Sequence, residues 1–254
     1  MDAALVGGCA VAGLTAGLIL DEVAAHIAPA RPLSEVAEPA AASAQSAVAA
    51  IAPGEPVVAV RPVPGPPKAA ERVAVSLVAA LAFALAAARL GAQPELAAYC
   101  ALFGGLVAVS VADLRVGLVP RVLLYPTFAL MAAGLVAAAA VDERWRPLEH
   151  AAIGGAGAFV VFFALWWCYP RGIGFGDVRL AGVLGAGLGW IGFGALYIGF
   201  AAAFLLGVVL GLVLMLRHGT GRKTRLAFGP PLALGATIGV LWGTWLVHAW
   251  TTHP

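Results

Sequence analysis

The chain has 254 residues, of which 62% are hydrophobic and only 11% are charged. Soluble domains carry roughly 25% charged residues, so this composition excludes an ordinary soluble globule, and it excludes disorder for most of the chain. The formal net charge of +2 is too small to indicate a nucleic-acid partner. Cys9, Cys100 and Cys168 are widely separated and form no C-x-x-C pair, so neither a zinc knuckle nor a disulfide framework is predicted.

Apolar runs bounded by charge or proline predict an all-α, polytopic membrane protein with about eight transmembrane helices. The runs are Ala3–Ile27, Val73–Leu90, Leu96–Ala112, Pro120–Val141, His150–Tyr169, Val178–Trp190, Gly192–Leu216 and Gly229–Trp250. The first run lacks a basic n-region and is too long for the apolar core of a signal peptide, so we expect a retained span. The sixth run is short and nearly continuous with the seventh, so these two runs could instead form one long kinked element.

The sequence divides into three parts. Residues 1–28 form the predicted first transmembrane helix, and residues 73–254 form the predicted membrane-embedded core. Between them, residues 29–72 are rich in alanine and proline and show no periodicity, which predicts a flexible or polyproline-like loop.

The basic residues are distributed unequally between the two sides of the predicted bundle. Twelve of the 15 Lys and Arg residues fall in the odd-numbered loops or at their edges. They are Arg31, Arg61, Lys68, Arg72, Arg115, Arg121, Arg171, Arg179, Arg217, Arg222, Lys223 and Arg225. The positive-inside rule therefore predicts that these loops are cytoplasmic and that both termini lie outside.

Two aspartates lie at the predicted cytoplasmic edge of the membrane. Asp113 ends the third span and Asp177 opens the sixth. A carboxylate at this depth is costly unless it is paired or hydrated, so both are functional candidates. Two facing carboxyls can share a proton, so that one activates a water while the other donates to a carbonyl oxygen. The alternative is that each is a helix-terminal charge, and Asp177 would then be stabilised by the helix dipole.

Glycines alternate immediately before the second aspartate, at Gly172, Gly174 and Gly176. Glycine weakens a helix by about 1 kcal/mol relative to alanine and permits close approach of another backbone. A protease needs such a segment to bind its substrate in an extended form, although a flexible loop is an equally simple explanation. Gly182, Gly185 and Gly189 recur on one helix face, which predicts close helix packing.

Three stretches of this sequence resemble a known family. They are Gly172-Ile-Gly-Phe-Gly-Asp-Val-Arg-Leu180, Ala112-Asp-Leu-Arg-Val-Gly-Leu-Val-Pro120 and Phe228-Gly-Pro-Pro-Leu-Ala-Leu-Gly235. They are similar to the G-x-G-x-G-D-V-K-L, D-x-x-x-x-x-I-P and F-G-P-F-L-A-L-G motifs of the prepilin peptidases, or type IV leader peptidases. These are intramembrane aspartic proteases of the G-x-G-D type, and Arg179 replaces their usual lysine.

The resemblance implies that Asp113 and Asp177 are the catalytic pair. It implies that the residues around them shape the site: Gly172, Gly174, Gly176, Arg115, Pro120, Arg179, Gly229 and Pro230. The implied substrate is a type IV prepilin-like precursor, whose basic leader is cleaved on the cytoplasmic side just before an apolar helix. The implied location is the bacterial inner membrane, in contact with lipid. Proteolysis would need no metal or cofactor.

The N-terminal third departs from the family pattern. Residues 29–72 contain none of the zinc-binding cysteines that relatives commonly carry there. Many relatives also methylate the new pilin N-terminus with S-adenosylmethionine, and this cofactor is expected here only if that activity is retained. Asp21 and Glu22 end the first span and are expected to be interfacial charges, with a role facing the site or a positive leader as the alternative.

Two other functions fit the same residues. A transporter or channel could use Asp113 and Asp177 as proton or cation ligands, and the recurrence of Asp-Leu-Arg and Asp-Val-Arg is a short hint of the internal repeat that this would predict. A non-catalytic scaffold for pilus assembly is the other alternative.

Overall fold

The structure is a computed structural model that describes residues 3–27, 69–116, 119–170, 173–218 and 228–252, and every regular element in these ranges is an α-helix. The helices are α1 (Ala3–Ile27), α3 (Ala69–Leu90), α4 (Leu96–Val116), α5 (Arg121–Val141), α6 (Arg146–Cys168), α7 (Phe175–Ile191), α8 (Phe193–His218) and α9 (Gly229–Thr252). The all-α prediction is confirmed. Helix α3 begins at Ala69, before the predicted start at Val73, and most of the predicted Ala/Pro-rich loop lies outside the described residues.

Seven of the described helices are long and apolar enough to cross a membrane, which identifies a multi-pass membrane protein. The remaining helix, α7, has 17 residues and lies at the lower limit for a span. Helices are expected because hydrocarbon offers the backbone no hydrogen-bonding partners, so each segment must satisfy its own N–H and C=O groups.

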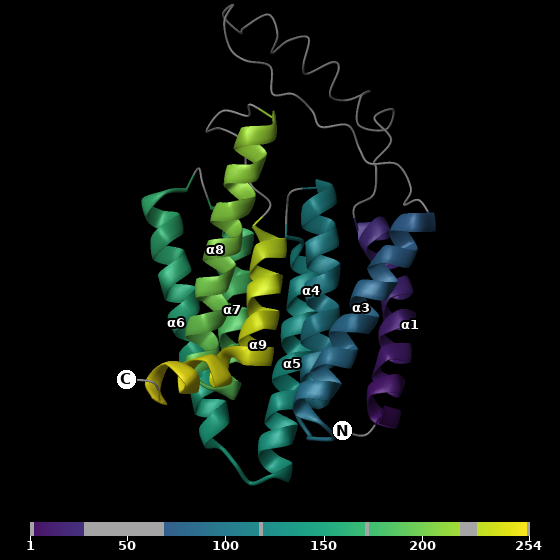
Figure 1. The fold of residues 1–254 in the computed structure, drawn as a ribbon, viewed down its shortest axis with the longest axis vertical. Helices are drawn as coiled ribbons and strands as arrows, with labels where there is room; N and C mark the ends of the chain where they lie inside the picture. Colours follow the sequence, from purple (N-terminus) through teal and green to yellow (C-terminus); the bar gives the residue numbers. More distant parts are fainter. Residues whose placement is uncertain (1–2, 28–68, 117–118, 171–172, 219–227, 253–254) are drawn as a thin grey trace, which may run out of the picture.

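Successive helices run in opposite directions through the bundle (Figure 1). The ends of α1, α4, α6 and α8 and the starts of α3, α5, α7 and α9 therefore gather at one end of the bundle, the upper end in Figure 1. We call this the site end, because Asp113, Asp177 and Gly229 all lie there. The chain termini extend from the opposite end.

The sixth and seventh runs form two helices and not one kinked element. Gly192 separates them with a φ of +142°, a backbone conformation that L side chains rarely adopt. Beyond it the chain turns back, so that a Leu188 methyl group packs where Gly199 has no side chain. The kinked-element alternative is therefore wrong. The glycine permits a reversal that other residues would resist.

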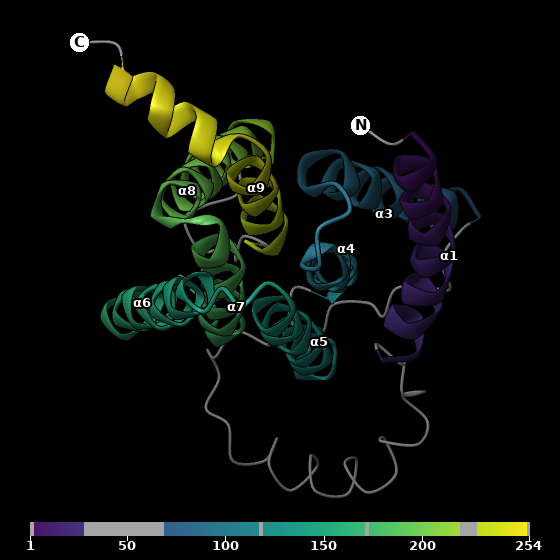
Figure 2. The ribbon, with the colours of Figure 1, turned by 90° about the horizontal axis from the view of Figure 1, so that it is seen from below.

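Helix α4 occupies the centre of the bundle. In the candidate span Leu96–Arg115 of α4, 67% of the residues are buried inside the protein, whereas the share is 39% or less in the other candidate spans. Seen along the bundle, α1 and α3 lie on one side of it and α6, α8 and α9 lie toward the other (Figure 2). The Tyr99 hydroxyl of α4 donates a buried hydrogen bond of 2.6 Å to the Gly187 carbonyl oxygen of α7. This bond joins the two helices that carry the candidate aspartates.

Small residues bring neighbouring helices into backbone contact. Gly182, Gly185 and Gly189 of α7 all face α6. A Cβ at Gly185 or Gly189 would collide with a backbone oxygen of α6, whereas one at Gly182 would make ordinary contact with Phe159. This confirms the predicted packing face. On the other side of the bundle, Gly17 of α1 lies against the Ser76 backbone of α3.

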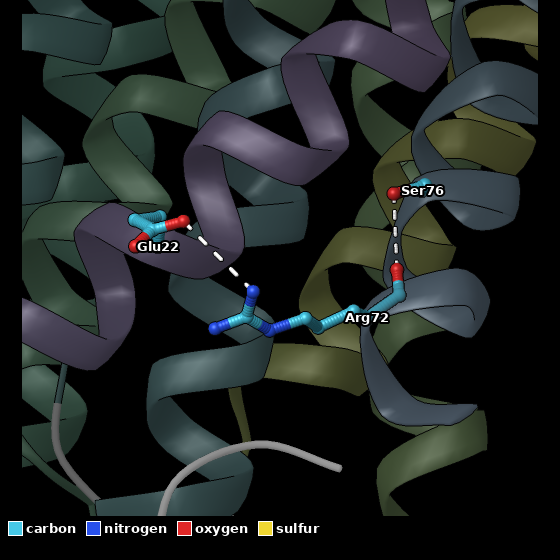
Figure 3. Close-up of polar contacts among 3 residues, drawn as sticks. All are labelled: Glu22, Arg72 and Ser76. Atoms are coloured by element: carbon cyan, nitrogen blue, oxygen red, sulfur yellow. Dashed lines mark hydrogen bonds and ion pairs between the residues drawn. The ribbon is translucent and has the colours of Figure 1, made fainter. Parts of the chain in front are cut away.

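An ion pair joins α1 and α3 at the site end, beside a hydrogen bond within α3 (Figure 3). Glu22 and Arg72 form an ion pair of 4.0 Å, and the Ser76 hydroxyl donates to the Arg72 carbonyl oxygen at 3.0 Å. Both charged side chains are well exposed, so the pair contributes little to stability, about 1 kcal/mol or less.

Candidate active site

Asp113 lies in the last turn of α4 and is buried, with 4% of its surface exposed. The C-terminal end of a helix disfavours a negative charge. The start of α9 offsets this, because the Gly229 N–H donates a hydrogen bond of 2.8 Å to Asp113 Oδ2. Pro230 and Pro231 have no N–H, so Gly229 supplies the only backbone donor among the first three residues of α9. The positive end of α9 is thus directed at this carboxyl group.

Asp177 lies in the first turn of α7 and is also buried, with 8% of its surface exposed. Gly174 precedes the helix as its N-cap and forms two hydrogen bonds with Asp177. The Gly174 N–H donates to Asp177 Oδ2 at 3.2 Å, and the Asp177 N–H donates to the Gly174 carbonyl oxygen at 3.0 Å. The bond from the Gly174 N–H is the N3 half of a capping box, and together with the backbone bond it fixes the aspartate relative to the helix start.

The fold brings the two carboxyl groups near one another, although they are separated by 64 positions in the chain. They are close enough for the charge of Asp113 to act on Asp177. The start of α7 also packs tightly against the segment that follows Asp113, since a Cβ at Gly176 would lie only 2.8 Å from the Val119 Cβ. The glycine therefore permits the close approach that brings α7 to this position.

The other predicted site residues take several positions. Pro120 is the N-cap of α5, and its carbonyl oxygen accepts the N–H groups of Leu123 and Leu124 at 3.2 Å each. The Arg179 guanidinium lies 4.5 Å from the centre of the Phe175 ring in a cation–π contact. Gly172 lies outside the described residues.

Arg115 forms an ion pair of 3.7 Å with Glu71 in the first turn of α3. The sequence analysis did not single out Glu71. The signal was available, because Glu71 precedes Ala74, Val75 and Val78 by three, four and seven positions and so shares their helix face. What the sequence did not show is which helix that face meets.

Two buried carboxyls of this kind can perform acid–base chemistry on a bound water and a carbonyl group. The same pair could also bind a proton or a cation. Among the described residues, no three His, Cys, Asp or Glu side chains gather in a way that could hold a metal ion.

Comparison with known proteins shows which family these residues are similar to. Residues 100–215, which include both aspartates, match the family model described as the type IV leader peptidase family. The chain is 34% identical over 150 residues to a prepilin leader peptidase/N-methyltransferase of Xanthomonas campestris, covering 57% of this chain and 50% of that protein. It is 32% identical over 174 residues to the protein of that name from Dickeya chrysanthemi, covering 66% and 58%.

The Pseudomonas aeruginosa protein of the same name is 29% identical over 174 residues, covering 66% of this chain and 57% of that protein. The chain thus spans about half the length of the curated relatives it matches. No solved structure matches it. These matches confirm the resemblance to this family that the three sequence motifs carry.

Proposed function

We propose that this chain, as a member of the type IV leader peptidase family, is an intramembrane aspartic endopeptidase that removes the basic leader from prepilin-like precursors. The observation that carries the proposal is the pair of buried carboxyls, Asp113 and Asp177, each held by a backbone N–H and near enough to interact electrostatically. The names of the relatives supply the substrate class.

The proposed reaction uses the two carboxyls in complementary protonation states. The ionised carboxylate takes a proton from a water, and the water oxygen attacks the carbonyl carbon of the scissile bond. The protonated carboxyl donates its proton to the carbonyl oxygen, which gives a neutral tetrahedral intermediate. That intermediate collapses by breaking the C–N bond, with a proton passing to the leaving nitrogen. A shared proton between close carboxyls supplies both states at once.

The surroundings of the pair suit an extended substrate. Ile173 and Gly174 precede the first turn of α7 and are not helical, and Gly174 and Gly176 have no side chains to block a second backbone. We propose that Gly172, Arg115, Pro120, Arg179 and Pro230 also shape this region. Gly229 positions Asp113 through its N–H.

We propose that the site end faces the cytoplasm of a bacterium and that both termini lie outside the inner membrane. The segments that join the helices at the site end, together with the helix ends beside them, carry twelve of the 15 Lys and Arg residues, as the positive-inside rule requires of the cytoplasmic side. The basic leader of a precursor would then meet the site without crossing the bilayer.

The names of the relatives also include N-methylation. S-adenosylmethionine carries an ammonium, a carboxylate and an adenine, all of which need polar partners when buried. The cavities between α3, α4 and α9, between α1, α4 and α5 and between α5, α6 and α7 are lined almost entirely by apolar side chains. Among the described residues, Arg179 in the last is the one charged residue that lines them, so none of the three fits this molecule. We therefore propose the peptidase step alone for the described part of the chain.

The test is cleavage of the Pseudomonas aeruginosa prepilin by the purified protein in lipid nanodiscs. Asp113→Asn and Asp177→Asn should each lower kcat by at least about a hundredfold, because acid–base catalysis contributes about 10²- to 10⁴-fold. Asp142→Asn is the matched control, since Asp142 lies at the opposite end of α5 from the site and should leave cleavage unchanged. Cleavage that survives either catalytic substitution in a folded protein would refute the assignment and leave a transporter or a scaffold as the explanation.

A further inference from the structure

An apolar groove runs along the outside of the bundle between α3, α4 and α9. Its cavity measures about 340 Å³ and is lined by side chains that include Val75, Val78, Val107, Leu114, Pro230 and Leu234. Val78, Leu114 and Leu234 are each more than half exposed, so the groove opens on the surface of the protein that faces lipid. An apolar helix could therefore enter it sideways from the bilayer.

The groove ends beside the candidate catalytic carboxyl. On α4 its lining reaches Leu114, the residue after Asp113, and on α9 it reaches Pro230, the residue after Gly229. Gly229 is the residue that binds the Asp113 carboxyl. The cavity between α1, α4 and α5 also reaches the site end, at Val122 on α5, but on α4 it ends at Ala108, five residues or about 7.5 Å below Asp113. A helix in the α3–α4–α9 groove would thus place the chain just before it at the site.

A carboxylate stands at the site end of this groove. Glu71 lies on the same face of α3 as Val75 and Val78, one turn closer to the site end. Its ion pair of 3.7 Å with Arg115 directs it toward α4, across the mouth of the groove. The Glu71 side chain is 56% exposed, so one edge of its carboxylate can accept a further cation.

We infer that this groove docks the apolar helix of the precursor and that Glu71 binds a basic residue of the leader; this rests on the proposed function. The charges favour this groove over the one between α5, α6 and α7. Arg115 at the mouth of the first groove is paired with Glu71, whereas the second groove is lined at its site end by Arg179, whose positive charge repels a basic segment. A cytoplasmic segment that precedes an apolar helix is enriched in Lys and Arg, so the carboxylate is complementary to it.

The first test is a charge swap with the Pseudomonas aeruginosa prepilin in nanodiscs. Glu71→Gln should raise KM by about two- to fivefold with little change in kcat, as expected for one partly exposed ion pair. Glu71→Lys should lower kcat/KM on the order of tenfold, and a precursor with its leader Lys changed to Glu should restore it. Glu149→Gln is the matched control, because Glu149 also lies in the first turn of its helix, α6, at the opposite end of the bundle.

Arg115→Gln separates leader binding from a purely structural role of the ion pair. If Glu71 only holds Arg115, Arg115→Gln will mimic Glu71→Gln, and kcat/KM will no longer depend on whether the leader carries Lys or Glu. If Glu71 binds the leader, the dependence will remain or increase, since the carboxylate is released from Arg115. Loss of the dependence in Arg115→Gln, or failure of the reversed leader to rescue Glu71→Lys, would overturn the inference.

The second test locates the helix by photo-crosslinking in a protein that carries Asp113→Asn and Asp177→Asn. A photoreactive residue at Val78 should link to the precursor, whereas one at Val160, an exposed position on α6, should link only to lipid. Linking from Phe128 in the α5–α6–α7 groove, with none from Val78, would refute the groove assignment. If the wild-type protein cleaves the precursor but these expected results are not obtained, only this inference is refuted. A wild type that cleaves no precursor refutes the proposed function, and this inference with it.

Discussion

The hydrogen bond between Gly229 and Asp113 makes a sharp test of how the site is built. In Gly229→Ala the new Cβ would lie 2.6 Å from Asp113 Oδ2 and 3.2 Å from the Asp113 Cβ. Separations under 3.0 Å are essentially never seen for Cβ atoms, so either the carboxyl or the start of α9 must move. Either movement breaks the 2.8 Å bond from the Gly229 N–H.

The expected loss follows from that bond. A hydrogen bond to a charged group contributes about 1.5–3 kcal/mol, and about 1.4 kcal/mol corresponds to a tenfold change in rate. If the bond serves to place the carboxyl for reaction, Gly229→Ala should lower kcat/KM for prepilin cleavage by about ten- to a hundredfold. The measurement is the initial rate of leader release in nanodiscs, well below the melting temperature of each variant.

Gly157→Ala is the matched control for this substitution. Gly157 is an exposed glycine within α6, and a Cβ there would meet no atom within 4 Å. It should leave cleavage unchanged and raise stability slightly, by about 1 kcal/mol or less, since alanine favours the helix. The reasoning is refuted if Gly229→Ala cleaves within about twofold of wild type, or if Gly157→Ala loses as much activity.

Two further substitutions probe the contacts that hold the aspartates. Gly174→Ala would place a methyl group 3.2 Å from Asp177 Oδ2, and a shift of a few tenths of an ångström relieves this contact. The rate of cleavage should therefore fall by less than about tenfold, which is a smaller loss than in Gly229→Ala. Equal or greater loss would contradict this ranking. Tyr99→Phe removes the 2.6 Å bond to the Gly187 carbonyl oxygen, and thermal or denaturant unfolding should show a loss of about 0.5–1.5 kcal/mol, with kcat nearly unchanged. An unchanged unfolding midpoint would show that this bond does not hold α4 to α7.

Much of the helix layout could be predicted from the sequence. The first apolar run, Ala3–Ile27, coincides with α1, and the other runs locate their helices to within a few residues. The reason is physical, since a long apolar segment in hydrocarbon has no alternative to satisfying its own backbone groups. The uncertain junction was resolved by Gly192, whose positive φ reverses the chain between α7 and α8. Sequence alone does not reveal such a reversal, because glycine also occurs within kinked helices.

The candidate aspartates were also identifiable in advance, because a carboxylate at the edge of an apolar helix is expensive and therefore conspicuous. The contacts around these aspartates could not be predicted from the sequence. The Gly229 N–H reaches Asp113 across 116 positions, and Glu71 meets Arg115 on a different helix. A membrane helix is apolar toward lipid and apolar toward its neighbours, so its pattern does not reveal which face is buried. The composition and charge of the chain thus determined its helices, while only their packing against one another decided which backbone donor met which carboxyl and where a groove was left open.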